Sequence, residues 1–589
     1  MKHMLLLLLF CCLFSCAQKI EGPRQKADNL NALFEQYWDE RAQYNTLEAT
    51  QQGDNRYNHI IANDQTATFR KTQRTFYANY LERLEDFDRE TLGENDKISY
   101  DVFKFEMVSQ LEGLKFKGWK IPFQQFWGLP LSMGQLGSGE SFQPFKTIQD
   151  YENWIGRMRD FSIWTDSAIE NFRKGMKSEF VLPKILVEKM IPQMEKLIVR
   201  EPRKSLFYHP ILNMPNSFTR QEKKNLAVKY IEAINRYINP SYKELKNFLE
   251  KEYLPHARET HGISGLPDGA EMYKYLVKSW TTTNLTPAEI YQMGLNEVSR
   301  IRLEMERVKD EVKFKGNLSA FFDYMKTDKK FTPYQHSTEI LNAFHDIHRR
   351  MSPQLKVMFN RTPKTPFEIR KTEDFRAASA SAEYNQGSPD GTRPGIFYIP
   401  ILNPKKFNTT SGMESLFLHE AIPGHHYQIS LQQENGELPK FRRFAWYGAY
   451  GEGWALYTES LGRELGLYKD PYQYMGALGD EMHRAVRLVV DVGIHTMGMK
   501  KDEAVKYMMN HQAISEEGAV AEIERYMAIP GQALSYKIGS LKIWELRKKY
   551  AKKLGKKFNL QAFHDELLKD GCLPLEVLER KMDAWVKTF

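Results

Sequence analysis

The sequence predicts a mostly α-helical protein with a minor β-sheet. Three observations predict this fold class. Apolar residues recur at three- and four-residue spacing over long stretches, which is the pattern of an amphipathic helix. Helix-start signals such as Thr286-Pro287-Ala288-Glu289 precede some of these stretches, with a capping threonine, proline in the first turn and glutamate at the third position. Extended, β-prone runs are few. We therefore expect a helical body with a small sheet.

The N-terminus differs from the rest of the chain. Met4–Phe14 is apolar but too short to cross a bilayer as a helix, so we predict that residues 1–15 form a signal peptide. The run ends in Leu13-Phe14-Ser15-Cys16, which resembles a bacterial lipobox, and a secretory signal with an incidental cysteine is the alternative. We expect export, a lipid on Cys16, a tether over residues 16–28, and anchoring at the periplasmic face or the outer membrane.

Beyond the tether, we predict one helical body over residues 29–589. Helical patterns dominate this body, as in Leu226–Ile238. The aromatic, glycine-rich segment Trp119–Phe142 shows no helical period, so we expect that segment to be irregular. The later predicted helices are the one that starts after Thr286, an interrupted helix over Ser411–Glu434, and Pro471–Met497, Asp502–Met509 and Pro574–Val586. Gly395–Ile399, bounded by turn-forming residues, is the clearest predicted strand.

Composition narrows the function classes. The 589 residues carry 27% charged and 13% aromatic side chains with a net charge of +8, which is typical of an ordinary globular protein. Basic and acidic residues alternate, and no basic block interleaved with aromatics predicts nucleic-acid binding. Cys11 and Cys12 lie in the predicted signal peptide and Cys16 is the predicted lipidation site, which leaves Cys572 without a partner. No disulfide framework is therefore expected, and stability must come from core burial.

The stretch His419–His426, HEAIPGHH, begins like the zinc-protease signature His-Glu-x-x-His. In that signature two histidines one helical turn apart hold Zn²⁺, and the glutamate, here Glu420, activates the metal-bound water. Pro423 stands where the second histidine is expected. Proline removes a backbone donor and clashes with the carbonyl four residues earlier, so the helix must kink or bulge.

Two histidines follow this break. A bulge that absorbs two residues, tolerated at Gly424, would return His425 to the position one turn after His419. His426 is the alternative, because it lies seven residues on and nearly on the same face. We favour His425 as the second ligand. A kinked core helix with polar residues at its bend is the structural alternative to a metal site.

The third ligand is expected downstream. Gly451–Glu459, GEGWALYTE, resembles the Asn-Glu-Gly-Phe-Ala segment of gluzincin aminopeptidases, and this resemblance implies Glu452 as a metal ligand. Glu459 lies seven residues later on nearly the same face, so it is a candidate either to orient a histidine or to be the ligand itself. A His₂Glu zinc site keeps a fourth position for water.

Peptide hydrolysis would also need a donor for the developing oxyanion. Tyr536, His495 and Arg487 are the candidates. Arg487, Asp491 and His495 follow one another at four-residue steps on one predicted helix face, so they could form a polar track that contacts substrate. A core tyrosine and a simple salt bridge are the alternatives.

These motifs together resemble the bacterial domain-of-unknown-function 885 family, and the resemblance covers roughly Asn29 to Thr588. The matching segments are Leu266–Gly269 with Tyr273, Thr281–Ile290, Asp390–Gly395, His419–His426, Gly451–Glu459 and Pro530–Gly539. The resemblance implies an exported or lipid-anchored, gluzincin-like metallopeptidase with two helical lobes around a deep cleft. It also implies that Gly395–Ile399 is an edge strand that holds substrate backbone. Pro400, where asparagine is expected, would shorten that strand.

Tyr384, Arg393 and Phe397 lie in or near this strand and are therefore implied as substrate contacts. The sequence predicts a Zn²⁺-dependent peptidase that hydrolyses short peptides in the cell envelope, with Glu420 as the general base. Two other functions remain open: a catalytically silent, metal-binding envelope lipoprotein, and an amidase that acts on cell-wall peptides.

Overall fold

A computed structural model describes residues 29–373, 377, 381–388, 391 and 393–589 of the chain. The mostly α-helical fold with a small sheet is confirmed over these residues. The predicted signal peptide, Cys16 and the tether lie outside the described residues. No helix in the described ranges combines the length and the apolarity needed to cross a bilayer.

Fourteen α-helices precede the first strand in the described part of the chain. They are α1 (Leu30–Arg41), α2 (Thr46–Gln51), α3 (Ala67–Leu84), α4 (Glu94–Gly113), α5 (Leu129–Gly137), α6 (Ile148–Met176), α7 (Lys184–Lys196), α8 (His209–Leu212), α9 (Arg220–Ala233), α10 (Asn239–Phe248), α11 (Gly269–Thr281), α12 (Pro287–Glu311), α13 (Leu318–Thr327) and α14 (Ser337–Met358).

A short sheet and a second helical series follow. The strands are β1 (Phe367–Lys371), β2 (Glu383–Asn385) and β3 (Gly395–Ile399). The helices are α16 (Met413–Glu420), α17 (His425–Glu434), α18 (Lys440–Arg443), α19 (Gly448–Ser460), α20 (Pro471–Thr496), α21 (Lys501–His511), α22 (Glu516–Ala528), α23 (Ser535–Leu554), α24 (Leu560–Leu568) and α25 (Leu575–Val586).

Local sequence signals located several of these elements well. Thr286 caps α12, and its side chain and that of Glu289 form the expected reciprocal capping box. The strand predicted at Gly395–Ile399 has those bounds in the structure. The pattern over Leu226–Ile238 corresponds to α9 and the wide helical turn at Ile234–Ile238 that continues it. Capping and periodicity act within one element, which is why sequence alone locates them.

The irregular segment predicted over Trp119–Phe142 is partly wrong, because it contains α5. A Cβ on Gly137 would lie 2.5 Å from the Phe207 ring, so this glycine lets the helix approach its neighbour. Glycine lowers helix propensity, and the packing that favours the helix comes from residues about 70 positions away. The local pattern therefore could not reveal it.

The sheet corrects one expectation. Its strand order is β1-β3-β2, with β3 parallel to β1 and antiparallel to β2. β3 is thus the central strand, and its backbone groups pair on both sides. The edge-strand role implied for Gly395–Ile399 is therefore wrong, because an edge strand must present unpaired N–H and C=O groups.

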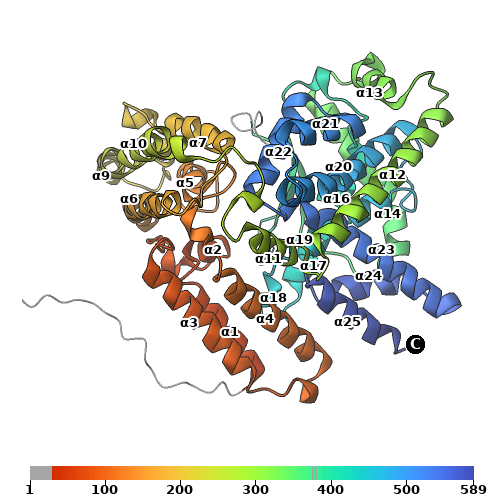
Figure 1. Cartoon of the computed structure of the whole chain (residues 1–589), viewed down its shortest axis with the longest axis horizontal. Helices are drawn as coiled ribbons and strands as arrows, with labels where there is room; N and C mark the ends of the chain where they lie inside the picture. Colours follow the sequence, from red (N-terminus) through yellow and green to blue (C-terminus); the bar gives the residue numbers. More distant parts are fainter. Residues whose placement is uncertain (1–28, 374–376, 378–380, 389–390, 392) are drawn as a thin grey trace, which may run out of the picture.

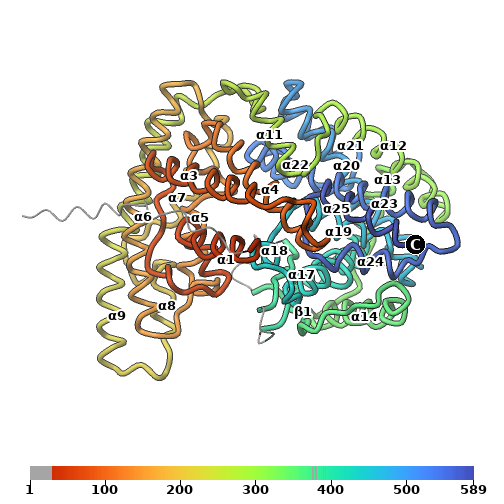
Figure 2. Tube along the Cα trace, turned by 90° about the horizontal axis from the view of Figure 1, so that it is seen from below, coloured from red at the N-terminus to blue at the C-terminus, as the bar shows by residue number. Residues whose placement is uncertain are grey.

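Two hydrophobic cores organise the helices. One core joins α1, α3 and α4 to the sheet and to the C-terminal helices α16–α19 and α23–α25. The other joins α5–α10 to α12, α13 and α20–α22. Figures 1 and 2 show α5–α10 on one side of the molecule and the C-terminal helices on the other. Two lobes around a cleft remain a prediction.

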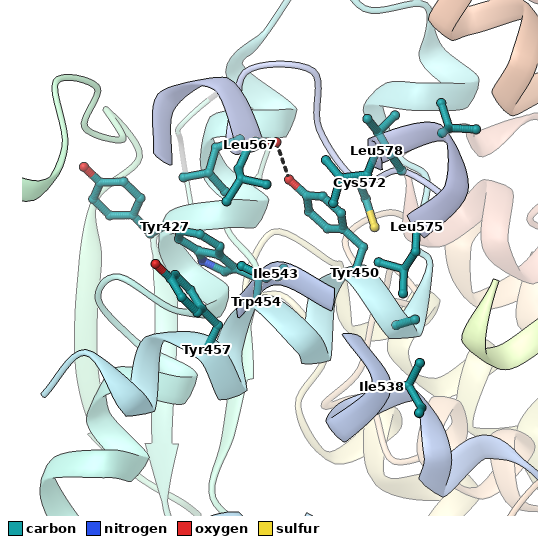
Figure 3. Close-up of a cluster of buried hydrophobic side chains, with 14 of the residues drawn as sticks. Tyr427, Tyr450, Trp454, Tyr457, Ile538, Ile543, Leu567, Cys572, Leu575 and Leu578 are labelled. Carbon is teal, nitrogen blue, oxygen red and sulfur yellow. Dashed lines mark hydrogen bonds between the residues drawn. The ribbon is translucent and has the colours of Figure 1, made fainter. Parts of the chain in front are cut away.

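The first core is dense around α19. Trp454, Tyr450 and Tyr457 project from α19 toward α23–α25 in Figure 3, and the Tyr450 hydroxyl donates a hydrogen bond of 2.7 Å to the Leu567 carbonyl. Cys572 lies fully buried in the same cluster. Burial raises the pKa of its thiol to about 12, which keeps it unreactive. This packing fixes α19, the helix that carries Glu452.

His564, in α24, links this core to stability at low pH. Its Nε2 accepts a 2.8 Å hydrogen bond from the Tyr457 hydroxyl, and its Nδ1 lies 3.0 Å from the Met358 carbonyl. Burial, with a smaller contribution from Arg547, lowers its pKa to about 3. The folded pKa lies below the unfolded value of about 6.5. The stabilisation is therefore complete above that pH and is lost as the pH falls toward 3.

We expect the free energy of unfolding to decrease below pH 6.5 by up to about 1.4 kcal/mol per pH unit through His564. Urea unfolding between pH 7.5 and 4.5 would measure this slope in the wild type and in His564→Gln. The variant should be less stable at pH 7.5 and lose less stability on acidification. Equal slopes in the two proteins would contradict the assignment.

Candidate metal centre

Three side chains converge at the end of α16. The Nε2 atoms of His419 and His425 each lie 3.5 Å from Oε2 of Glu452. One ligand atom from each residue can be chosen so that all three lie within 4.8 Å of one another. The two histidines are buried and Glu452 is half-buried. The structure thus brings together the three residues for which the sequence predicts metal binding.

Their spacing fits a small cation. Two ligand atoms about 2.0–2.1 Å from a tetrahedral zinc ion are about 3.3–3.4 Å apart, close to the 3.5 Å found for each histidine–glutamate pair. The imidazole rings of His419 and His425 meet nearly at right angles, with centroids 4.8 Å apart. Two imidazoles and one carboxylate are a donor set typical of zinc.

A break in the helix creates this convergence. α16 ends at Glu420 and α17 begins at His425, so the expected kink or bulge is a four-residue interruption. A Cβ on Gly424 would lie 1.9 Å from the carbonyl oxygen of His419. Only glycine allows the chain to turn this closely against α16, and this turn brings His425 beside His419.

α19 is tied directly to the break. The indole Nε1 of Trp454 donates a 2.8 Å hydrogen bond to the carbonyl of Pro423, and the Thr458 hydroxyl donates one of 2.8 Å to the carbonyl of Leu418. The glycines beside Glu452 also have packing roles. A Cβ on Gly451 would lie 2.2 Å from the Trp446 ring, and one on Gly453 would lie 2.5 Å from Gly539 of α23. The GEGW motif thus holds Glu452 against the break.

Glu459 lies two turns after Glu452 on α19 and contacts the other side of His419. Its Oε1 is 2.7 Å from Nδ1 of His419. A carboxylate on Nδ1 fixes the ring so that Nε2 faces Glu452 and His425. Of the two possibilities considered for Glu459, this geometry fits the residue that orients a histidine.

The centre is strongly acidic. Burial alone would lower the pKa of His419, but its hydrogen bonds to Glu452 and Glu459 outweigh burial and raise that pKa to about 10. Burial alone would raise the pKa of Glu452, yet the two histidines hold it well below its usual range. The carboxylates of Glu452 and Glu459 thus stabilise positive charge at His419, and the same carboxylates would stabilise a metal cation bound to the deprotonated ring.

Glu420 remains available beside this cluster. Burial raises the pKa of its carboxyl, partly offset by the charges of His419 and His425. The side chain is half-buried, and within the described ranges its carboxylate has no hydrogen-bond or ion-pair partner. A carboxylate with a raised pKa and free oxygens is suited to accept a proton.

His426 faces the sheet instead of the cluster. Its Nδ1 is 3.0 Å from the Tyr384 hydroxyl of β2, and its ring packs 4.8 Å from that of Phe367. Burial, together with His348, lowers its pKa to about 4, so the ring is neutral at physiological pH. A Cβ on Gly395 would lie 2.3 Å from the Tyr384 hydroxyl. His426 therefore connects α17 to the sheet.

Tyr536 and Arg487 lie together. The Arg487 guanidinium is 4.6 Å from the centroid of the Tyr536 ring, and it also binds Tyr526 and Glu522 at 3.0 Å. The Tyr536 ring is half-buried, and its hydroxyl has no hydrogen-bond partner among the described residues. Tyr536 is thus available as a donor, whereas Arg487 is engaged in an internal network.

His495 has a structural environment. Its Nδ1 accepts a 3.0 Å hydrogen bond from the Ile263 amide, and its Nε2 is 3.0 Å from the Tyr526 carbonyl. The side chain is fully buried. Asp491, on the same face, accepts hydrogen bonds from Tyr273 and from the Gly531 amide. The polar track is therefore internal, and His495 has no free ring nitrogen for catalysis.

The predicted substrate contacts separate in the structure. Phe397 is fully buried and packs edge-on against Phe344 at 5.3 Å, so it is a core residue with no surface for a substrate. Arg393 is exposed and lines a cavity of about 930 Å³ between the sheet and the segment around Phe142. Its Nη1 donates a 2.7 Å hydrogen bond to the Gln386 carbonyl.

Two further residues lie near the centre that the motifs do not include. Arg484 of α20 lies 3.8 Å from Glu459, and the Trp446 ring packs 5.7 Å from that of His425 while 46% of the residue is exposed. The position of Trp446 just before the GEGW motif is the one local indication of its role. Arg484 belongs to a different helix and could be found only from tertiary structure.

Comparisons place the chain among bacterial proteins. The sequence profile of the family described as "Bacterial protein of unknown function (DUF885)" matches residues 47–582. The search of curated proteins gave no match. A candidate lipoprotein from Colwellia psychrerythraea is similar over 95% of this chain and 99% of its own, with 27% identity and a TM-score of 0.88.

Two further solved structures are more distant. A candidate lipoprotein of unknown function from Shewanella oneidensis shares 19% identity over 94% of this chain and 100% of its own, with a TM-score of 0.73, which shows a common fold. A carboxypeptidase from Pyrococcus furiosus shares 9% identity over 96% of this chain and 98% of its own, with a TM-score of 0.40. That likeness is too remote to carry an argument.

Proposed function

This chain belongs to the bacterial DUF885 family, and we propose that it is a zinc-dependent peptidase that hydrolyses short peptides in the cell envelope. The observation that carries the proposal is the convergence of His419, His425 and Glu452 beside Glu420, whose carboxylate has no partner among the described residues. A structural cation site would need only the three ligands. Hydrolysis also requires a general base, and the half-buried carboxylate of Glu420, with its raised pKa, is suited to that role.

In the proposed mechanism the three ligands hold the ion and Glu459 keeps His419 oriented through its 2.7 Å contact with Nδ1. Zinc bound there would supply Lewis-acid polarisation of the scissile carbonyl and a nucleophile at neutral pH. Glu420 accepts the proton of the attacking water and passes it to the leaving amine. The hydroxyl of Tyr536 is the proposed donor to the developing oxyanion.

Anchoring in the envelope is the second part of the proposal. The lipobox-like Leu13-Phe14-Ser15-Cys16 of this sequence supports it, as does the description of two proteins of the same fold as candidate lipoproteins. A lipid on Cys16 would place the peptidase at the periplasmic face or the outer membrane. Metabolic labelling with a radioactive or clickable fatty acid would test this. We expect the wild-type protein to incorporate the label and Cys16→Ser to incorporate none.

Zinc titration of the purified protein, followed by exposure to a broad library of short peptides, tests the peptidase. We expect one zinc ion per chain and metal-dependent cleavage detected by mass spectrometry. Stoichiometric zinc without cleavage of any peptide would favour a silent metal-binding lipoprotein. Cleavage of muropeptides alone would favour a cell-wall amidase. Failure to bind any divalent cation would remove the proposal altogether.

A further inference from the structure

A small cavity lies against Trp446, whose ring packs against that of the metal ligand His425. It has a volume of about 260 Å³, and its walls include Trp446, Gln386, Gln433, Arg443 and Glu48; we refer to it as the Trp446 cavity. At about 30 Å³ per water, it has room for about nine waters, which is the scale of one or two amino-acid residues.

Trp446 connects this cavity to the metal ligand His425. Its ring lies 5.7 Å from that of His425, and it packs over Gly451, whose missing side chain makes room for it beside Glu452. Trp446 is nevertheless 46% exposed, whereas His425 is 8% exposed. An open aromatic face directly against a buried ligand is positioned to contact what binds at the centre.

The walls offer unpaired amides. Gln433 is 6% exposed, and its side-chain amide has no hydrogen-bond partner in the described part of the chain. The same is true of the half-buried side-chain amide of Gln386, which follows β2 directly. An amide without a partner in the protein is able to donate and accept hydrogen bonds with a ligand, so these groups favour an occupant that offers both donors and acceptors, as a peptide backbone does.

The cavity also has one uncompensated charge. Glu48 is paired with Arg41 at 2.7 Å, which removes the negative charge of the wall. The Nε of Arg443 donates a 2.5 Å hydrogen bond to the Gln433 carbonyl. Its two terminal nitrogens form no ion pair with a carboxylate of the described residues. A guanidinium with two free nitrogens is suited to bind a carboxylate in a bidentate manner.

We infer that the Trp446 cavity holds the C-terminal residue of a peptide substrate. The terminal carboxylate binds Arg443, the backbone amide meets Gln386 and Gln433, and the side chain lies on the face of Trp446. Since the cavity takes only one or two residues and is connected to the ligand His425 through Trp446, cleavage falls near the C-terminus. This inference rests on the proposed peptidase function and names its substrate as short peptides with a free carboxyl end.

The test uses Glu420→Gln, so that binding is measured without turnover. Calorimetry would compare two tetrapeptides of one sequence with an aromatic last residue, one ending in a free acid and one in an amide. We expect the free acid to bind at least about 10-fold more tightly than the amide, which is the size of effect that a hydrogen bond between charged groups produces. Adding Arg443→Gln should abolish this preference. Trp446→Ala should weaken both peptides, and Trp446→Phe should restore part of the affinity.

Lys440→Gln is the matched control, because Lys440 lies on the same helix but pairs with Glu35 and does not line the cavity. It should keep the preference for the acid. Equal binding of acid and amide, or a preference that survives Arg443→Gln, would overturn the inference.

Wild-type cleavage separates this inference from the function on which it rests. Cleavage of both peptides at internal bonds would leave the peptidase standing and remove the C-terminal subsite. An Arg443-dependent preference in binding without any hydrolysis would support the subsite and remove the peptidase. Release of the last one or two residues from the acid alone supports both.

Discussion

Glu420→Gln is expected to lower kcat for peptide hydrolysis by about 100- to 10,000-fold, the range for loss of a general base. The amide keeps the size and polarity of the carboxylate but cannot accept the proton of the attacking water. Glu420 has no hydrogen bond or ion pair in the described structure that the change would break, so stability should be nearly unchanged. Steady-state kinetics, with zinc content measured by mass spectrometry, would check both expectations.

The control for this variant is Glu437→Gln, which alters an exposed glutamate in the segment that follows α17. It should retain full activity and full zinc content. Loss of zinc in Glu420→Gln would make Glu420 a ligand instead of a base. Unchanged kcat would exclude it from the mechanism, even if the centre binds zinc as proposed.

Exchanging the two adjacent histidines for alanine should separate their roles. His425→Ala removes one of three ligand atoms, so zinc affinity should fall by about 100-fold or more, beyond the 10- to 100-fold typical of residues that only orient a ligand. His426→Ala should retain zinc, because its ring contacts Tyr384 and Phe367 in the sheet. Its effect should be a loss of stability of about 1–3 kcal/mol from the broken hydrogen bond.

Competition with a fluorescent zinc chelator and urea unfolding measure the two quantities on the same samples. Each variant is the matched control of the other, since both change a buried histidine in the first turn of α17. The assignment fails if His426→Ala loses zinc while His425→Ala keeps it. Loss of zinc in both, with unfolding in both, would be resolved by His426→Gln, which can keep a hydrogen bond to Tyr384.

The sequence predicts the elements whose cause is local and misses those whose cause is distant. α12 could be located because its cap, its first-turn proline and its apolar face all lie within it. α5 could not, because its glycines lower helix propensity and its packing partners, such as Phe207 against Gly137, lie far along the chain. The position of β3 at the centre of the sheet is likewise a property of pairing with two other strands, which no feature of Gly395–Ile399 announces.

The candidate centre follows the same division. His419, Glu420 and Glu452 can be identified from short sequence motifs. The choice between His425 and His426 depends on how the chain turns at Gly424, and the structure brings His425 to Glu452. From the sequence alone His495 is a reasonable catalytic candidate, but its Nδ1 accepts a hydrogen bond from the amide of Ile263, 232 positions away. Trp446 and Arg443 become candidates for substrate binding only because the folded chain places both in the wall of one cavity.

The interruption between α16 and α17 makes ion binding a property of the assembled protein. In an uninterrupted His-Glu-x-x-His helix, the periodicity of one segment sets the distance between the two histidines. Here that distance depends on Trp454, which holds the carbonyl of Pro423 from another helix, and on Glu459, which orients His419. A peptide covering residues 411–434 should therefore bind zinc poorly. Docking of α19 must precede or accompany capture of the ion, so a nascent or misfolded chain would not retain it.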